Sequence, residues 1–224
     1  FDPDNNKVLF GFRIGSAGGV KVIVGTVSGT SISFGTATSI DNGSNETGGT
    51  MAYDATAQKL VVNYPSANNS QYGASVIGTV SGTSISFGTP VVYTSSAINT
   101  GVGTGTVYDP VSQKVLLGYR DNSVARGYGI VGTVSGTSIS FGTAVKYSGD
   151  NVTAGMKFGY STSASKILIV YENENTNDGL ALTATISGTS VSFGSAVSIG
   201  QLPQNNVGTA VFDPDNNKVV VFYA

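Results

Sequence analysis

Short apolar runs separated by polar, glycine-rich segments recur along the whole 224-residue chain. Some runs are almost continuously apolar, such as KVLLGY at 114–119, and this composition is typical of a strand covered on both faces. Other runs alternate, such as SISFG at 84–88, where serine alternates with isoleucine and phenylalanine as in a strand with one exposed face. The pattern therefore predicts an all-β protein.

The runs are organised by a repeat. The phrase GTVSGTSISFGT occurs unchanged at 25–36, 78–89 and 132–143, and a close variant, ATISGTSVSFGS, occurs at 184–195. The glycine of its Ser-Gly pair recurs at intervals of 53, 54 and 52 residues, and a fixed period of this size indicates a repeat architecture. A second phrase, which begins as FDPDNNKV, marks the start of each unit. The units are 1–52, 53–107, 108–159, 160–211 and the partial 212–224.

Each complete unit is predicted to contain four strands, A to D. Strand A is a run of small residues that ends in an aromatic, strand B is apolar throughout, and strand C ends at the Ser-Gly pair. That pair predicts a tight hairpin into strand D, because glycine accepts positive φ without steric cost. Inner strands covered on both faces and an outer strand covered on one face are typical of a propeller blade.

The sequence thus predicts a β-propeller of four-stranded antiparallel blades, with four full repeats and a partial fifth in a single repeat domain. A linear β-solenoid and a fibre of stacked four-stranded modules are the alternatives. The first unit opens at the end of a strand A and the last stops after a strand B. We therefore expect either a segment of a longer array or a ring closed between the last and first strands.

Sequence variation is concentrated in two kinds of connection. In an antiparallel four-stranded sheet, the BC and DA loops emerge at one end and the AB and CD turns at the other. The BC and DA loops differ in nearly every copy, whereas the turns barely change. Variable loops on one side of a rigid scaffold indicate a binding surface, and unconstrained drift of loop sequences is the alternative.

The variable loops are rich in neutral polar side chains and contain two tyrosines, which together suit sugar hydroxyls and sugar rings. They also contain one charged cluster, in the third BC loop. The candidate ligand-binding residues are Asn45, Asn68, Asn69, Tyr72, Asn99, Arg120, Asp121, Arg126, Tyr128, Asn151, Glu172, Asn175 and Asn205.

Composition and charge exclude several classes of binding partner and of chemistry. The net charge is −2 and only 11% of residues are charged, so no electrostatic field draws nucleic acid or an anionic membrane. The chain has no cysteine and no histidine, which removes the thiolate nucleophile, the usual general base and the commonest transition-metal ligands. No apolar run is long enough to span a bilayer. We expect no cofactor and no metal.

Two chemical sites were considered. A glycosidase needs two carboxylates at a defined separation, and no pair among the loop carboxylates is marked by the sequence, so we expect no enzyme. The segment DPDNN at 2–6 has the oxygen density of a calcium loop, but the second and third copies lack it, so an Asx turn is predicted instead. The Asp that opens this turn lies five residues before a lysine, which predicts a surface ion pair across the turn.

With FDPDNNKV followed by VGTVSGTSISFGT, the chain resembles tandem repeats of phage structural or appendage proteins and of bacterial surface proteins, particularly those from marine metagenomes. The resemblance covers the whole chain and implies a location that is extracellular, on a cell surface or on a virion. It carries no Trp-Asp pair and no sialidase box, and so implies no enzymatic activity.

The expected function is a non-catalytic binding module that recognises glycans or a surface receptor through the BC and DA loops. The alternative is a structural repeat or decoration protein that contacts partner subunits of a virion or surface assembly, and a glycan-active hydrolase is the third hypothesis. The sequence does not decide whether the chain forms homo-oligomers.

Overall fold

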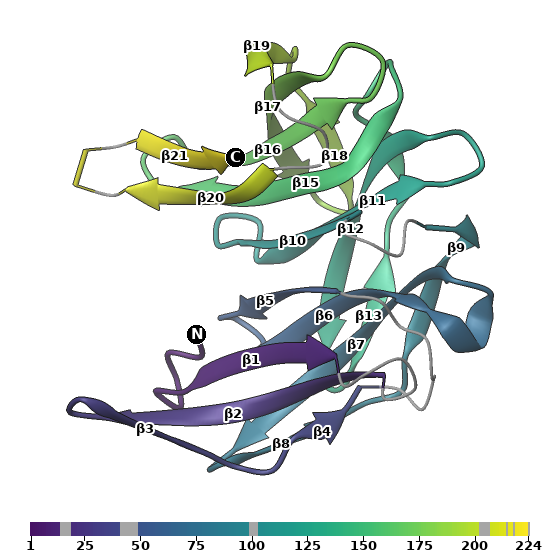
Figure 1. The fold of residues 1–224 in the computed structure, drawn as a ribbon. Coiled ribbons are helices and arrows are strands. Elements are labelled where there is room, and N and C mark those ends of the chain that lie inside the picture. Colours follow the sequence, from purple (N-terminus) through teal and green to yellow (C-terminus); the bar gives the residue numbers. More distant parts are fainter. Residues whose placement is uncertain are drawn as a thin grey trace.

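The fold is built from β-strands that form five antiparallel sheets in chain order (Figure 1). This computed structural model describes residues 1–13, 19–40, 49–98, 103–201, 207–213, 215–216 and 218–223. No α-helix occurs among them, and η1 (Ala67–Asn69) is a single 3-10 turn. The predicted all-β class is therefore confirmed.

The strands divide among the sheets as follows. The first sheet contains β1 (Val8–Arg13), β2 (Val20–Ser28), β3 (Ser31–Phe34) and β4 (Thr38–Ser39). The second contains β5 (Thr50–Asp54), β6 (Lys59–Ser66), β7 (Tyr72–Ser81), β8 (Ser84–Phe87) and β9 (Val91–Ala97). The third contains β10 (Thr104–Asp109), β11 (Lys114–Asp121), β12 (Arg126–Ser135), β13 (Ser138–Phe141) and β14 (Val145–Lys146). The fourth contains β15 (Val152–Ser161), β16 (Lys166–Asn173), β17 (Asp178–Ser187), β18 (Ser190–Phe193) and β19 (Val197–Gln201), and the fifth contains β20 (Val207–Asp213) and β21 (Lys218–Tyr223).

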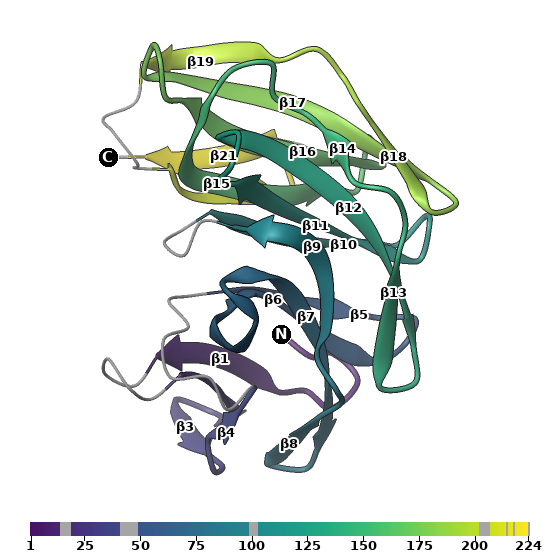
Figure 2. The ribbon, with the colours of Figure 1, turned by 90° about the vertical axis from the view of Figure 1, so that its right-hand side faces the viewer.

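Within the second, third and fourth sheets, strands A to D are hydrogen-bonded to one another in sequence order, as the repeat predicts. The Ser-Gly hairpins are also confirmed, because each of their glycines has φ between +59° and +62°. We call the end of the stack with the BC and DA loops the loop end, and the opposite end the turn end. Figure 2 shows the hairpins of β8, β13 and β18 along one edge of the stack. The hairpin glycines are Gly29, Gly82, Gly136 and Gly188.

The outer strand differs from the prediction of one continuous strand D. In the second sheet, β7 pairs with β8 along Gly78–Ser81 and with β9 along its opposite half, so the outer strand is broken in two. The break follows Gly88, whose N–H still donates to the Ile77 carbonyl at 2.9 Å. The first, third and fourth sheets have the same break. The four-stranded blade therefore becomes a five-stranded sheet in three of the units.

The sheets stack face to face (Figure 1), and strand B of the second, third and fourth sheets, namely β6, β11 and β16, is buried on both faces. In β6, Leu60 and Val62 belong to the apolar core shared with the first sheet. The intervening Val61 belongs to the core shared with the third sheet. This alternation is the packing that the continuous apolar runs predict.

A close backbone contact joins consecutive sheets near the turn end. The glycine that follows SISF in one sheet lies against the threonine of the Ser-Gly-Thr turn in the next, so that any Cβ on this glycine would overlap the threonine carbonyl. Only glycine allows this approach. The contact gives a physical reason why the threonine of the Ser-Gly-Thr turn and the glycine after the fourth strand recur in every copy of the phrase. The contacting pairs are Gly35 with Thr83, Gly88 with Thr137, and Gly142 with Thr189.

The AB turns that open with an aspartate are Asx turns, as predicted. Asp2 Oδ1 accepts the N–H groups of Asp4 and Asn5 at 3.0 and 3.1 Å. The expected ion pair across the turn is wrong, because Lys7 Nζ donates instead to Thr26 Oγ1 at 2.8 Å. The carboxylate is already occupied by the turn N–H groups, and the lysine extends along its own sheet.

No helix among the described residues is long and apolar enough to cross a membrane.

Candidate loop-end site

The predicted residues are distributed over several parts of the loop end. Asn68 and Asn69 lie exposed on η1, Tyr72 begins β7 half-buried, and Asn175 is exposed after β16. The remaining described candidates lie in the third and fourth sheets. Asn45, Asn99 and Asn205 lie outside the described residues.

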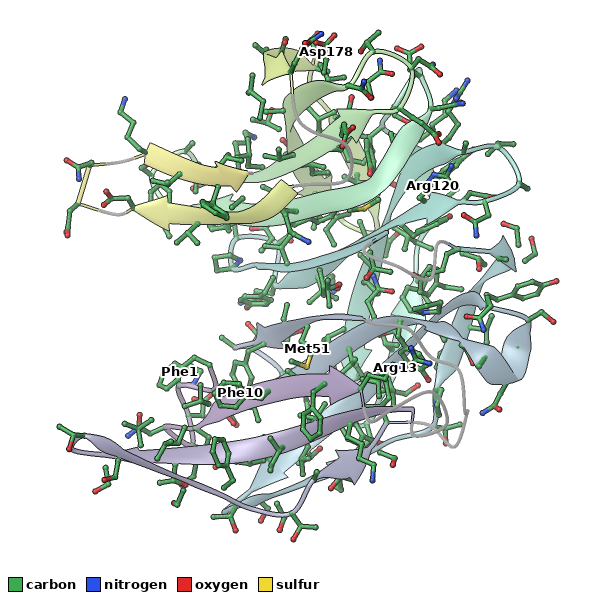
Figure 3. The ribbon with its side chains drawn as sticks, viewed as in Figure 1. Phe1, Phe10, Arg13, Met51, Arg120 and Asp178 are labelled. Atoms are coloured by element: carbon green, nitrogen blue, oxygen red, sulfur yellow. The ribbon has the colours of Figure 1, made fainter. Side chains whose placement is uncertain are left out.

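Arg120 is the centre of the polar network between the third and fourth sheets. Its Nε donates to the Val152 carbonyl at 2.6 Å, and its Nη1 donates to Asn122 Oδ1 at 2.8 Å. Its Nη2 forms an ion pair with Glu174 Oε2 at 3.3 Å. One guanidinium therefore connects a BC loop, the start of the next strand A and the next BC loop. Figure 3 labels Arg120.

A second set of hydrogen bonds joins the DA loop of the third unit to its neighbours. Arg126 donates to Asn151 Oδ1, and the Asn151 carbonyl accepts the N–H of Glu174 at 2.9 Å. Asn173 Nδ2 donates to Asp150 Oδ2 at 3.2 Å. The loops of two consecutive units are thereby held in one arrangement.

Asp121 connects this network to the second unit. Its carboxylate accepts the Ser96 hydroxyl at 2.7 Å and both the N–H and hydroxyl of Ser123, at 2.8 and 2.6 Å. Burial by itself raises the pKa of Asp121, but the hydrogen bonds from Ser123 and Ser96 outweigh burial and lower the pKa below its usual value. Asp121 is therefore a carboxylate in the folded protein at neutral pH.

Two of the candidate ligand-binding residues, Glu172 and Tyr128, are less accessible than the sequence predicts. Glu172 was assigned to a loop, but β16 continues to Asn173 and Glu172 is fully buried within it. Tyr128 is half-buried, and its ring stacks on Tyr119 with centroids 5.6 Å apart and an interplanar angle of 15°. Glu172 is thus out of reach of a ligand in this structure, and one face of Tyr128 is covered.

Sequence reasoning missed several members of the network. Ser96 and Ser123 are common loop residues that give no signal on their own, and Asn173 was counted only as part of a variable loop. Glu174 had a usable signal, because it lies 54 residues after Arg120, which is one repeat. Residues one repeat apart face each other when sheets stack in sequence order.

The described residues contain no group of three or more acidic, histidine or cysteine side chains that could hold a metal ion. A hollow of about 450 Å³ lies between the outer strands of the first and second sheets, lined by residues that include Ser39, Ile40, Phe87 and Pro90. None of the candidate residues lines it.

No family model and no curated protein matches the sequence. Two solved structures are similar in fold. The crystal structure of a nidogen/laminin complex has a TM-score of 0.53 and 12% identity, over 96% of this chain and 70% of that one. The crystal structure of AofleA from Arthrobotrys oligospora has a TM-score of 0.56 and 10% identity, over 98% of this chain and 65% of that one. At these identities the likeness shows the fold alone.

Proposed function

We propose that the chain is a non-catalytic binding module of the β-propeller type, and that its loop end recognises a glycan. The observation that carries the proposal is the network around Arg120, which joins variable loops of consecutive units into one preorganised polar surface. Preorganised polar groups lose little conformational entropy on binding, which favours affinity.

The chemistry of this surface favours a neutral polar ligand. Asn122 and Asn175 are both exposed: Asn122 belongs to the network, since its Oδ1 accepts from Arg120, and its Nδ2 offers donors, whereas the amide of Asn175 offers both donors and an acceptor. The charges at the centre are already paired, since Arg120 contacts Glu174 and Asp121 is held by serine groups. Sugar hydroxyls match such a surface better than a strongly charged ligand does.

Two observations support a propeller arrangement. The A strands of consecutive units, β5, β10, β15 and β20, contact one another, as they do around a propeller axis. The two similar solved structures cover nearly the whole chain. The proposal places the module on a virion or cell surface, in line with the resemblance to tandem-repeat surface proteins.

A glycan array probed with the 224-residue chain tests the binding proposal. We expect binding to particular glycans, and a loss of about tenfold or more in affinity for Asn122→Ala and Asn175→Ala. A loss of this size corresponds to about 1.4 kcal/mol. The matched control is Ser138→Ala, an exposed residue of β13 near the turn end, which should bind normally. Absence of glycan binding, or equal loss in all three variants, would overturn the proposal.

A structural role in an assembly is the second candidate, because the first sheet exposes several large apolar side chains, including Phe10 and Phe34. Stable co-assembly with shell or filament subunits, without any sugar affinity, would favour this role over glycan binding.

A further inference from the structure

The outward face of the first sheet is apolar, and large side chains on it, such as Phe10, Ile32 and Phe34, are exposed. Alternation along the strands places one set of side chains away from the second sheet, and we call this set the head face. Phe10 and Phe34 meet on it edge to face, with ring centroids 5.7 Å apart. Figure 3 shows Phe10 on β1. The head face consists of Val8, Phe10, Phe12, Ile23, Val27, Ile32 and Phe34, with Lys21 as its charged residue at the loop end.

The same positions are buried in the following units. Ile32 is 44% exposed, whereas its counterparts are 4 to 6% exposed. Phe10 is 43% exposed, whereas its counterparts are at most 1% exposed. In each case the preceding sheet covers the position. The counterparts of Ile32 are Ile85, Ile139 and Val191, and those of Phe10 are Val62, Leu117 and Ile169.

A second observation points to the same kind of occupant. In the three contacts between consecutive units, the glycine of one sheet lies on the threonine of the next Ser-Gly-Thr turn. Thr30 is the equivalent threonine of the first sheet, and none of these three glycines contacts it. The head face therefore presents both halves of the interface that is used inside the chain, its apolar side chains and its turn.

We infer that the head face receives a further four-stranded sheet of this same repeat type. The sheet must include the outer hairpin of the repeat. The glycine that would contact Thr30 comes directly after the first half of strand D, and the side chains of Ile32 and Phe34 are covered only when a strand C packs on them. Strands β20 and β21 of a second copy expose Val211, Val220 and Phe222, but they supply only positions A and B. A second copy docked through these strands would leave β3 uncovered. This inference is independent of ligand binding at the loop end.

The chain itself suggests how to supply that sheet. Residues 212–219 and residues 1–8 are both FDPDNNKV, so placing a copy of residues 152–211 before Phe1 recreates the existing junction between units and supplies a sheet with all four strand positions, β15 to β19. Since the chain has no cysteine, an Ile32→Cys variant carries a single thiol on the head face. We expect this thiol to react with a maleimide severalfold more slowly in the extended chain than in the original chain. We also expect the unfolding midpoint of the extended chain to rise by about 5 °C or more, since 1 kcal/mol shifts the midpoint of a chain this size by roughly 2–4 °C.

Two controls make the test specific. In the added unit, Leu168→Glu with Ala181→Glu charges the face that packs on the next sheet, and both gains should be lost. Gly194→Ala in the added unit places a Cβ against Thr30 and should also remove the gains. At the original position, the same Gly194→Ala change brings a Cβ to 2.9 Å from Thr183 Oγ1 of its own sheet and against no described residue of a neighbouring sheet, so it should leave the gains.

Two results would overturn the inference. The first is an extended chain in which the Ile32→Cys thiol reacts as fast as in the original chain and the unfolding midpoint is unchanged. The second is self-association of the original chain that Phe10→Lys or Phe222→Lys abolishes and the added unit does not prevent, since this would assign the head face to β20 and β21 of a second copy. Neither result depends on glycan binding, so this inference and the proposed function fail separately.

Discussion

Gly88 lies so close to Thr137 that no side chain fits between them, and a Cβ on Gly88 would overlap the Thr137 carbonyl oxygen. Both residues belong to the repeated phrase, but to consecutive units. The phrase is therefore retained in part because each copy forms one side of a contact with the next copy.

The contact predicts a large effect for Gly88→Ala. The added methyl group has to displace backbone of the third sheet, and overpacking of this kind costs about 1–3 kcal/mol of the free energy of unfolding. Gly149→Ala is the matched control, because nothing lies within 4 Å of a Cβ there. Chemical denaturation of both variants measures the difference. Equal stability of the two variants would show that the sheets separate easily at this point.

The hydrogen bonds of Asn63 predict a second contribution of contacts between the second and third sheets to stability. Asn63 is fully buried, its Nδ2 donates to the carbonyls of Gly105 and Gly118 at 3.1 and 3.2 Å, and its Oδ1 accepts the Tyr93 hydroxyl at 2.6 Å. Asn63→Ala should cost about 1–3 kcal/mol, because the Tyr93 hydroxyl is left buried without this acceptor. The double variant with Tyr93→Phe should lose less than the sum of the two single losses. Strict additivity in a denaturation cycle would contradict this assignment.

The network around Arg120 predicts unequal effects for its members. Arg120→Ala should cost about 1.5–3 kcal/mol, because the Val152 carbonyl loses a charged donor. Glu174→Gln should cost less than about 1 kcal/mol, since the Glu174 side chain is 46% exposed and surface ion pairs contribute little. Thermal unfolding at low and high salt checks both values. A larger loss for Glu174→Gln than for Arg120→Ala would show that the ion pair dominates.

The lowered pKa of Asp121 predicts that the protein loses part of its folding stability in acid. The pKa of Asp121 is lower in the folded protein than the usual value of about 3.9 in the unfolded chain. Its stabilising contribution is therefore fully present above about pH 4 and is lost as the pH falls through the lowered pKa. Asp121→Asn should be less stable than the original chain at pH 6, and the difference should shrink below pH 4. A constant difference across a pH titration of the unfolding midpoint would exclude this linkage.

Much of the fold follows from the sequence because the repeat fixes where each strand begins. The continuous apolar run KILIVY predicted a strand buried on both faces, and Ile169 and Val170 lie in different cores. The hairpin at Gly82 followed from the Ser-Gly pair. Closure into a propeller stays a prediction.

The site was less predictable, because loop composition does not reveal hydrogen-bond partners. Glu172 and Glu174 are both glutamates in a variable segment, but one ends inside a strand and the other contacts Arg120. Only the register of β16 separates them. The broken outer strand was also missed. It occurs in the fourth sheet too, where Gly194 contacts no Ser-Gly-Thr turn of another unit, so the contact between units is not its cause.

The contact between Gly88 and Thr137 has a consequence for how the protein can change over evolutionary time. Because it is made by backbone atoms at the turn end, it sets the spacing of units without using any loop side chain. Substitutions and length changes in the loops then leave the relative placement of the units intact. Each unit can acquire its own recognition surface while its neighbours keep theirs.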